Sequence, residues 1–303
     1  MDKAVSVQNI SKNFGNVEAV RDVSFDVRPG EIFGMLGPNG AGKTTCIRIM
    51  LDIFKANSGK VLVFGGQLDD SLKNRIGYLP EERGLYKDMK LETTLVYLAT
   101  LKGVSEKTAR SHLEVWLKRL DLYEHRNKKI QDLSRGMQQK AQFISTLIHE
   151  PDLIIVDEPF SGLDPVNTRL IKRIIQEQCD AGKTIIMSTH QMHQVEALCS
   201  RIVLIDEGYS VLYGDVDRIK RDFAGHAVEI QGKGNFENLP GVLESRFENG
   251  GWHLTLDESI TPQEIFQNIA NRENVTVERF EIAESSLEDI FVSIVQDKKL
   301  VEQ

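Results

Sequence analysis

Apolar and polar residues alternate along residues 4–10 and again along residues 17–28, which is the period of half-buried β-strands. A turn is expected between these two strands, at residues 13–16. Two other runs, 32–36 and 153–156, are apolar throughout, as is typical of strands that a parallel sheet buries on both faces. Shorter strands are predicted at residues 59–64, 75–80, 184–188 and 202–205. The pattern therefore predicts a mostly parallel sheet with an antiparallel β subdomain near the N-terminus.

Helical periodicity replaces this pattern in the middle of the chain. Apolar residues lie three and four positions apart in residues 91–101, 106–120 and 136–148. These helices separate the strands and form an insertion at about residues 84–150. Further helices are predicted at residues 46–54, 166–179 and 191–198. Strands that alternate with helices are typical of an α/β domain, in which ligands bind at the carboxyl ends of the parallel strands.

The pattern changes once more near residue 224. Strands are predicted at residues 227–231, 252–256 and 275–282, and helices at residues 262–270 and 286–295. We therefore expect an α/β domain formed by residues 1–223 and a small separate α+β domain formed by residues 224–303.

Charge is distributed unevenly between these two domains. Residues 224–303 carry 15 acidic and 6 basic side chains, whereas residues 1–223 carry 30 acidic and 31 basic ones, and the whole chain has a net charge of -8. A negatively charged domain repels phosphate backbones and anionic lipid headgroups. Nucleic acid and a bare membrane surface are therefore not expected as partners.

The composition is that of a globular protein, with 41% hydrophobic and 27% charged residues among 303. Cys46, Cys179 and Cys199 lie far apart without a C-x-x-C spacing, so the sequence predicts neither a disulfide framework nor a zinc site. This cysteine usage fits a reducing cytoplasm. No stretch approaches the roughly 18 apolar residues of a membrane-spanning helix, so we expect any membrane-spanning part to be another polypeptide.

Residues 37–44 read Gly-Pro-Asn-Gly-Ala-Gly-Lys-Thr and match the phosphate-binding pattern G-x-x-x-x-G-K-[ST] between a strand and a helix. The glycines let backbone N–H groups converge on phosphates, and the helix N-terminus adds a partial positive charge. Lys43 is expected to reach the outer phosphates, and Thr44 to ligate the Mg2+ ion that bridges them. The residues expected to bind a nucleoside triphosphate are Gly37, Pro38, Asn39, Gly40, Ala41, Gly42, Lys43, Thr44 and Thr45. The flanking strand and helix disfavour the alternative, a plain glycine-rich turn.

Asp157 and Glu158 directly follow the apolar run 153–156. A carboxylate at this end of a buried strand can meet the magnesium of the phosphate loop, so Asp157 is the expected metal partner. Glu158 is expected to act as a general base or to position the attacking water. Either residue alone would indicate an acidic turn after a strand, but the phosphate loop upstream favours the functional interpretation.

Several further motifs are uninformative when taken singly. Ser134 and Gly136 stand at a helix start, where serine is a common cap, and His190 follows a strand. Phe14, in the first turn, is either a core anchor or a ring that stacks on adenine. Together with the phosphate loop, the order aromatic residue, G-x-x-x-x-G-K-T, L-S-x-G, D-E-P, S-G-L-D and S-T-H resembles the nucleotide-binding subunits of ATP-binding cassette (ABC) transporters, across residues 1 to about 220.

This resemblance implies an ATPase that dimerises around two ATP molecules and drives a separate transmembrane permease at the cytoplasmic face of the cell membrane. It implies that Phe14 stacks on the adenine ring and that His190 contacts the γ-phosphate. It also implies that Ser134 and Gly136 contact the ATP of the partner subunit and that Asp164 links the subunits, in a homodimer or a heterodimer. An imidazole N–H beside developing phosphate charge stabilises it by about 3 kcal/mol in a dry site.

Two residues depart from the family pattern. Glu81 stands where the family usually has a glutamine that touches magnesium, so it is a candidate metal ligand, or a partner for the neighbouring Arg83. Arg135 replaces the first glycine of the signature. Its charge at a helix start is unfavourable unless a phosphate or carboxylate neutralises it.

The stretch Glu-Ser-Ser-Leu-Glu-Asp-Ile-Phe at residues 284–291 resembles the C-terminal extension on ATPase subunits of two-gene exporters, the group that includes sodium-extrusion and drug-resistance pumps. The alternatives are a soluble ABC-type ATPase that acts on DNA or ribosomes and a regulatory module that binds ATP without turnover. The single cassette without long heptad runs disfavours the first, and Glu158 disfavours the second. The sequence does not indicate a transported substrate.

Overall fold

The computed structural model describes residues 3–82, 84–223, 227–234, 236, 239–248, 250–257, 259–272, 275–283 and 286–301. The chain divides into two compact units, Met1–Asp215 and Val216–Gln303. The sequence pattern predicts a boundary after residue 223, but helix α8 (Val216–Phe223) packs against α10 (Leu287–Val301) within the second unit. The division therefore lies before α8.

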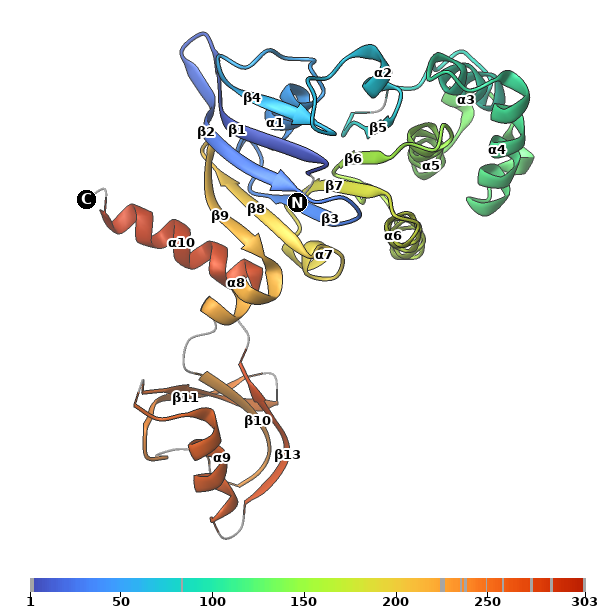
Figure 1. Ribbon diagram of the computed structural model, residues 1–303. Helices are drawn as coiled ribbons and strands as arrows, with labels where there is room; N and C mark the ends of the chain where they lie inside the picture. Colours follow the sequence, from blue (N-terminus) through green and yellow to red (C-terminus); the bar gives the residue numbers. More distant parts are fainter. Residues whose placement is uncertain are drawn as a thin grey trace. The chain divides into compact units, whose positions relative to one another are not determined.

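A six-stranded sheet forms the centre of the first unit (Figure 1). Its strands follow the order β5-β6-β7-β3-β8-β9, and all neighbours are parallel except β9, which is antiparallel to β8. The strands are β3 (Ile32–Leu36), β5 (Ile76–Leu79), β6 (Leu153–Asp157), β7 (Thr184–Thr189), β8 (Arg201–Asp206) and β9 (Tyr209–Asp215). Every residue of β3, β6 and β7 is buried, which explains the apolar runs at residues 32–36 and 153–156. The predicted mostly parallel sheet is confirmed.

A three-stranded antiparallel sheet, in the order β2-β1-β4, comes from the N-terminal part of the same unit (Figure 1). Its strands are β1 (Val5–Phe14), β2 (Val17–Val27) and β4 (Ser58–Val63). Helix α1 (Lys43–Met50) joins the two sheets, because its buried side chains share one hydrophobic core with both. The prediction that Phe14 lies in the first turn is wrong. Phe14 is the last residue of β1 and pairs with Val17, because Gly15 at φ 59° permits a two-residue turn.

The predicted helical insertion is also present. Its helices are α3 (Leu91–Leu101), α4 (Glu106–Arg119) and α5 (Arg135–Leu147). Helix α5 packs against α3, α4 and strand β5, so the insertion is connected to the edge of the parallel sheet. The other helices of this unit are α2 (Asp70–Lys73), α6 (Pro165–Asp180) and α7 (Met192–Glu196).

The second unit is an antiparallel sheet in the order β11-β12-β10-β13 with helix α9 on one face (Figure 1). Its elements are β10 (Ala227–Lys233), β11 (Val242–Glu248), β12 (Gly251–Leu256), α9 (Pro262–Ala270) and β13 (Thr276–Ile282). Ile265 and Ile269 of α9 are buried with Val228, Ile230 and Leu254 of the sheet. Among the described residues of both units, no helix is long and apolar enough to span a membrane.

Candidate functional site

A cavity of about 410 Å³ opens where strands β3 and β6 end. It is lined by Ala19, Asn39, Gly40, Ala41, Gly42, Lys43, Thr44, Thr45, Glu81, Asp157 and Glu158. All of these except Ala19 are predicted site residues. Segments separated by more than a hundred positions in the sequence thus meet at the carboxyl end of the sheet, as expected for a parallel α/β domain.

The phosphate loop runs from β3 into α1 through three glycines with positive φ. Gly37, Gly40 and Gly42 have φ angles of 146°, 82° and 107°. A Cβ atom on Gly37 would lie 2.0 Å from the Ile205 carbonyl oxygen, and one on Gly42 would lie 2.5 Å from that of Ala19. Both positions therefore require glycine. Helix α1 begins at Lys43, earlier than the predicted residue 46, because Gly42 is its N-cap.

The Lys43 side chain is folded back onto this loop. Its ammonium group donates to the carbonyl oxygens of Gly37 at 2.7 Å and Pro38 at 3.0 Å. Only 6% of Lys43 is exposed, and burial lowers the pKa of its ammonium group, against the opposing effect of the nearby Glu158, Asp157 and Glu81 charges. The only hydrogen bonds described for this cation go to neutral carbonyl groups, which an anion can replace.

Thr44 and Asp157, two of the three predicted metal ligands, are in direct contact. The Thr44 hydroxyl group donates to Asp157 Oδ2 at 2.9 Å, and Ser188 Oγ donates to Asp157 Oδ1. Asp157 is 2% exposed. Partial burial and, secondarily, the Asp157 charge raise the pKa of the half-buried Tyr78 to about 12. Hydroxyl and carboxylate oxygens are hard donors, so this arrangement fits magnesium.

Glu158 lies beside His190, as the sequence predicts for two residues of one site. Glu158 Oε1 accepts hydrogen bonds from the His190 backbone N–H at 2.9 Å and from the His190 ring at Nδ1 at 2.8 Å. A carboxylate only accepts, so the proton of the ring must be on Nδ1. Glu158 Oε2 accepts from the Thr189 hydroxyl group at 3.1 Å. Glu158 also has a positive φ of 50°, which is uncommon for a residue other than glycine.

Glu81 is exposed, yet it lines the same cavity as Lys43. Its charge acts to raise the pKa of Lys43, less strongly than the charges of Glu158 and Asp157. The loop that carries it is held by Gln142, whose amide donates to the carbonyl oxygens of Pro80 and Glu82. The alternative partner, Arg83, lies outside the described residues.

Phe14 does not line the cavity. It is 43% exposed and packs edge-on against Phe54, with ring centroids 5.3 Å apart. The Lys12 ammonium group lies 5.2 Å from its centroid. Its accessible ring leaves room for a planar ligand, and its role stays a prediction.

Ser134, Gly136 and Asp164 also lie away from this cavity. Ser134 and Asp164 are N-caps of α5 and α6: the Ser134 hydroxyl accepts from the Met137 N–H at 3.3 Å, and Asp164 Oδ1 accepts from the Val166 and Asn167 N–H groups. Backbone N–H bonds lower the pKa of Asp164. Arg135, the first residue of α5, is exposed and has no described ion-pair partner.

Sequence reasoning missed three residues of the site. Ala19 contributes to the cavity wall from β2, and Ser188 and Thr189 hold the two carboxylates from β7. Ser188 and Thr189 belong to the S-T-H motif, from which only His190 was predicted. The missing signal was the pairing of Asp157 with Ser188 between neighbouring strands.

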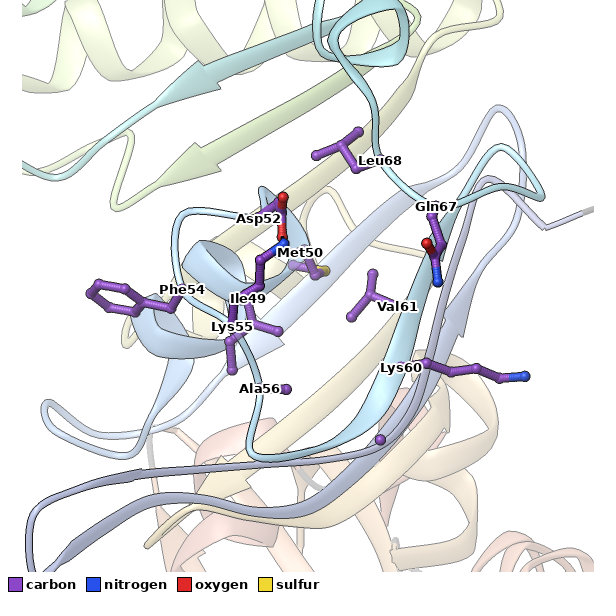
Figure 2. A pocket seen from close by; sticks show the side chains of 11 residues that line it. Ile49, Met50, Asp52, Phe54, Lys55, Ala56, Lys60, Val61, Gln67 and Leu68 are labelled. Atoms are coloured by element: carbon purple, nitrogen blue, oxygen red, sulfur yellow. Dashed lines mark hydrogen bonds and ion pairs between the residues drawn. The ribbon is translucent and has the colours of Figure 1, made fainter.

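A second cavity, of about 270 Å³, lies between the C-terminal end of α1 and β4 (Figure 2). Its lining includes the apolar Ile49, Met50 and Val61. The charged residues Lys55 and Asp52 also line it and pair with each other at 2.5 Å. None of the predicted site residues contributes to this lining.

Two family models match the chain. The model of the ABC transporter family matches residues 20–161. The model of the C-terminal domain of DrrA1-3-like ATP-binding proteins matches residues 214–295.

Curated proteins and solved structures are similar to most of the chain. The uncharacterized ABC transporter ATP-binding protein YhaQ of Bacillus subtilis is 39% identical over 96% of this chain and 98% of its own length. The linearmycin resistance ATP-binding protein LnrL of the same organism is 33% identical over 69% of this chain and 68% of its own. A solved ATP-binding subunit of an ABC transporter superposes with a TM-score of 0.69 at 30% identity, over 73% of this chain and 93% of that one. These likenesses confirm the predicted fold.

Proposed function

Because this chain belongs to the ABC transporter ATP-binding proteins, we propose that it hydrolyses ATP with magnesium, as a dimer, and thereby powers a separate membrane-spanning exporter. The observation that carries this proposal is the convergence of Lys43, the Thr44–Asp157 pair and Glu158 on one cavity. His190, which does not line the cavity, is hydrogen-bonded to Glu158. A cation, a metal-ligand pair and a base are the three elements that phosphoryl transfer to water requires.

Each group then has one task. Lys43 exchanges its two carbonyl partners for phosphate oxygens, which carry full charge and therefore bind the ammonium group more strongly. Glu158 positions the attacking water, and the His190 imidazole donates to the γ-phosphate. Phe14 stacks on the adenine ring, and the glycine-rich loop surrounds the phosphates with N–H groups.

Thr44 and Asp157 are the residues that would hold magnesium, and Glu81 faces the same cavity. When bound, the ion supplies positive charge to the phosphate oxygens. To hold the ion, the Thr44 hydroxyl group would offer an oxygen lone pair in place of the hydrogen bond that it now donates to Asp157. Ser188 keeps Asp157 in place during this change, because it donates to the other carboxylate oxygen.

The proposed dimer gives a role to the motif residues that do not line the cavity. Ser134 and Gly136 lie at the N-terminus of α5, where N–H groups attract a phosphate, and we propose that they complete the cavity of a partner subunit. Asp164 is exposed at the start of α6, from which it can link the two subunits. Homodimer and heterodimer are both compatible with this arrangement.

We assign the exporter role, and a position at the cytoplasmic face of the membrane, from the resemblance of both units. LnrL is named for resistance to linearmycin, and the second unit matches the DrrA1-3-like domain model. Both features fit an ATPase that expels a compound.

The experiment is to affinity-purify the tagged chain from native membranes and to measure ATP hydrolysis with magnesium and with a chelator. Magnesium-dependent turnover and a co-purified multispanning protein are expected. Turnover without a membrane partner would support the soluble ABC-type ATPase instead. Absence of turnover, with ATP still bound, would support the regulatory module.

A further inference from the structure

We propose that Thr189 is a positioning residue for Glu158, whose carboxylate its hydroxyl group holds in the orientation needed to place the attacking water. The inference rests on the proposed function, since it concerns the step assigned to Glu158. Three observations carry it: the direction of the Thr189 hydroxyl proton, the burial of Thr189, and the register between β6 and β7.

The direction of the Thr189 hydroxyl proton is fixed by its second partner. The backbone N–H of Gln191 donates to Thr189 Oγ1 at 3.1 Å. An N–H group only donates, so it uses a lone pair of the hydroxyl oxygen and leaves the hydroxyl proton for another acceptor. That acceptor is Glu158 Oε2, 3.1 Å away. Thr189 therefore donates to the carboxylate.

Burial distinguishes Thr189 from the other side chain that holds Glu158. The side chain of His190 is 46% exposed, whereas Thr189 is 1% exposed. The imidazole is thus free to turn from Glu158 towards a phosphate, but the threonine hydroxyl group is fixed in β7. When the imidazole turns away, the Thr189 hydroxyl group and the His190 backbone N–H remain as donors, one to each carboxylate oxygen.

The register between the strands explains why these contacts come as a pair. Asp157 of β6 lies opposite Ser188 of β7. The residues that follow them, Glu158 and Thr189, therefore also lie beside each other. Each hydroxyl group serves one carboxylate: Ser188 donates to Asp157, and Thr189 donates to Glu158. The positive φ of Glu158 is an unfavourable conformation that neighbouring contacts must maintain, and the Glu158 N–H donates to the Ser188 carbonyl at 3.0 Å.

The first test compares Thr189→Val with wild type in steady-state ATP hydrolysis. Valine keeps the shape and removes the donor, and a hydrogen bond to a charged group is among the stronger ones. We expect kcat to fall about tenfold or more while KM for ATP stays within about twofold, because Thr189 does not line the nucleotide cavity.

Thr184→Val is the matched control. Thr184 is the first residue of the same strand, is 3% exposed, and accepts a backbone N–H from Gly30 at 3.0 Å without facing a site carboxylate. It reproduces the loss of a buried N–H partner, so kcat of folded protein is expected within about twofold of wild type. Equal losses of kcat in Thr184→Val and Thr189→Val would overturn the proposal, because they would indicate a purely structural effect.

Two further variants sharpen the assignment. Thr189→Ser keeps the hydroxyl group and is expected to restore most of kcat, whereas failure to restore it would overturn the proposal. In a Glu158→Gln background, adding Thr189→Val is expected to change the residual rate by less than about twofold, and a full additional loss would also overturn it. If Thr189→Val does not fold, Thr189→Ala replaces it in single-turnover measurements.

A wild-type protein without turnover would refute the proposed function itself, whereas an active wild type with an equally active Thr189→Val would refute only this inference.

Discussion

Buried charged side chains occur at both ends of the parallel sheet, and their hydrogen-bond and ion-pair partners differ between the two ends. At the end where β8 begins, Arg201 pairs with Glu31 at 3.0 Å and with Asp26 at 3.6 Å, and it also donates to the Tyr213 hydroxyl. At the carboxyl end, Lys43 donates to carbonyl groups, while Asp157 and Glu158 accept from hydroxyl groups and an imidazole. No ion pair joins Lys43 to either carboxylate within the described ranges.

This difference shows how a buried charge is kept for a ligand. Arg201 pairs with Glu31 and Asp26, and Lys3 pairs with Asp26 at 3.4 Å, so each of these carboxylates has a cation partner within the protein. The Arg201–Asp26 pair also connects β2 of the antiparallel sheet to the parallel one. Lys43 and the two carboxylates share one cavity without neutralising each other, so a phosphate and a metal ion find opposite charges available there. We therefore expect loss of the first group to reduce stability and loss of the second to reduce activity.

The largest effect is expected for Glu158→Gln. The amide cannot take the proton of the attacking water, so kcat is expected to fall at least about a thousandfold. ATP affinity should remain and the dimer should accumulate with ATP bound, which size-exclusion chromatography with ATP and magnesium measures. Normal turnover of this variant would refute the role assigned to Glu158.

Arg201→Ala tests the other side of the comparison. Removing one partner of a buried pair leaves Glu31 uncompensated, which costs about 3 kcal/mol in the free energy of unfolding. The ATPase rate per folded molecule should stay close to that of wild type. Urea unfolding measures the stability of both variants. Arg110→Ala, which removes a half-exposed arginine from Glu92 and Glu106, is the control and should lower the urea midpoint far less than Arg201→Ala does. Equal destabilisation by both variants would contradict the difference between the two groups.

Lys43→Ala is expected to weaken ATP binding about a hundredfold, because the ammonium group is the main cation of the cavity. The free energy of unfolding should change little, because water can take the place of the ammonium group as the donor to the loop carbonyls. Titration with a fluorescent ATP analogue measures the affinity. Lys60→Ala, at the second cavity, is the control and should bind ATP as wild type does.

Local sequence motifs predicted most of the residues that line the cavity. The phosphate loop and the Asp157–Glu158 pair are contiguous motifs, and their spacing from neighbouring strands encodes their geometry. Thr189 and the Arg201–Glu31–Asp26 group depend on pairing between distant strands, which no local pattern reports. The same limit applies to the boundary before Val216, which follows from packing of α8 on α10.

Irregular strands were missed for a different reason. Strand β11 has a register shift between Val242 and Glu244, which interrupts the alternation that identifies a strand. Its Leu243 and Phe247 are 69% and 61% exposed, so apolar positions there do not mark a buried face. Strand β9 also alternates poorly, because it mixes half-buried and exposed residues at the sheet edge.

The smallest effect is expected at Glu81, the third carboxylate of the cavity. It is exposed and lines the same cavity as Lys43, so it adds negative charge near the phosphates. A like-charge pair about 5 Å apart costs about 3 kcal/mol at an effective dielectric constant near 20, and solvent around an exposed group reduces this cost.

We therefore expect Glu81→Gln to tighten ATP binding about three- to tenfold in chelator, where no metal compensates the repulsion. With magnesium, turnover should change by less than about threefold, since Thr44 and Asp157 remain as the principal ligands. Glu82→Gln is the matched control, because Glu82 is adjacent and also exposed but does not line the cavity. Unchanged metal-free affinity in Glu81→Gln would mean that this carboxylate turns away from the phosphates when ATP binds. A large loss of magnesium-dependent turnover would instead identify Glu81 as a direct metal ligand.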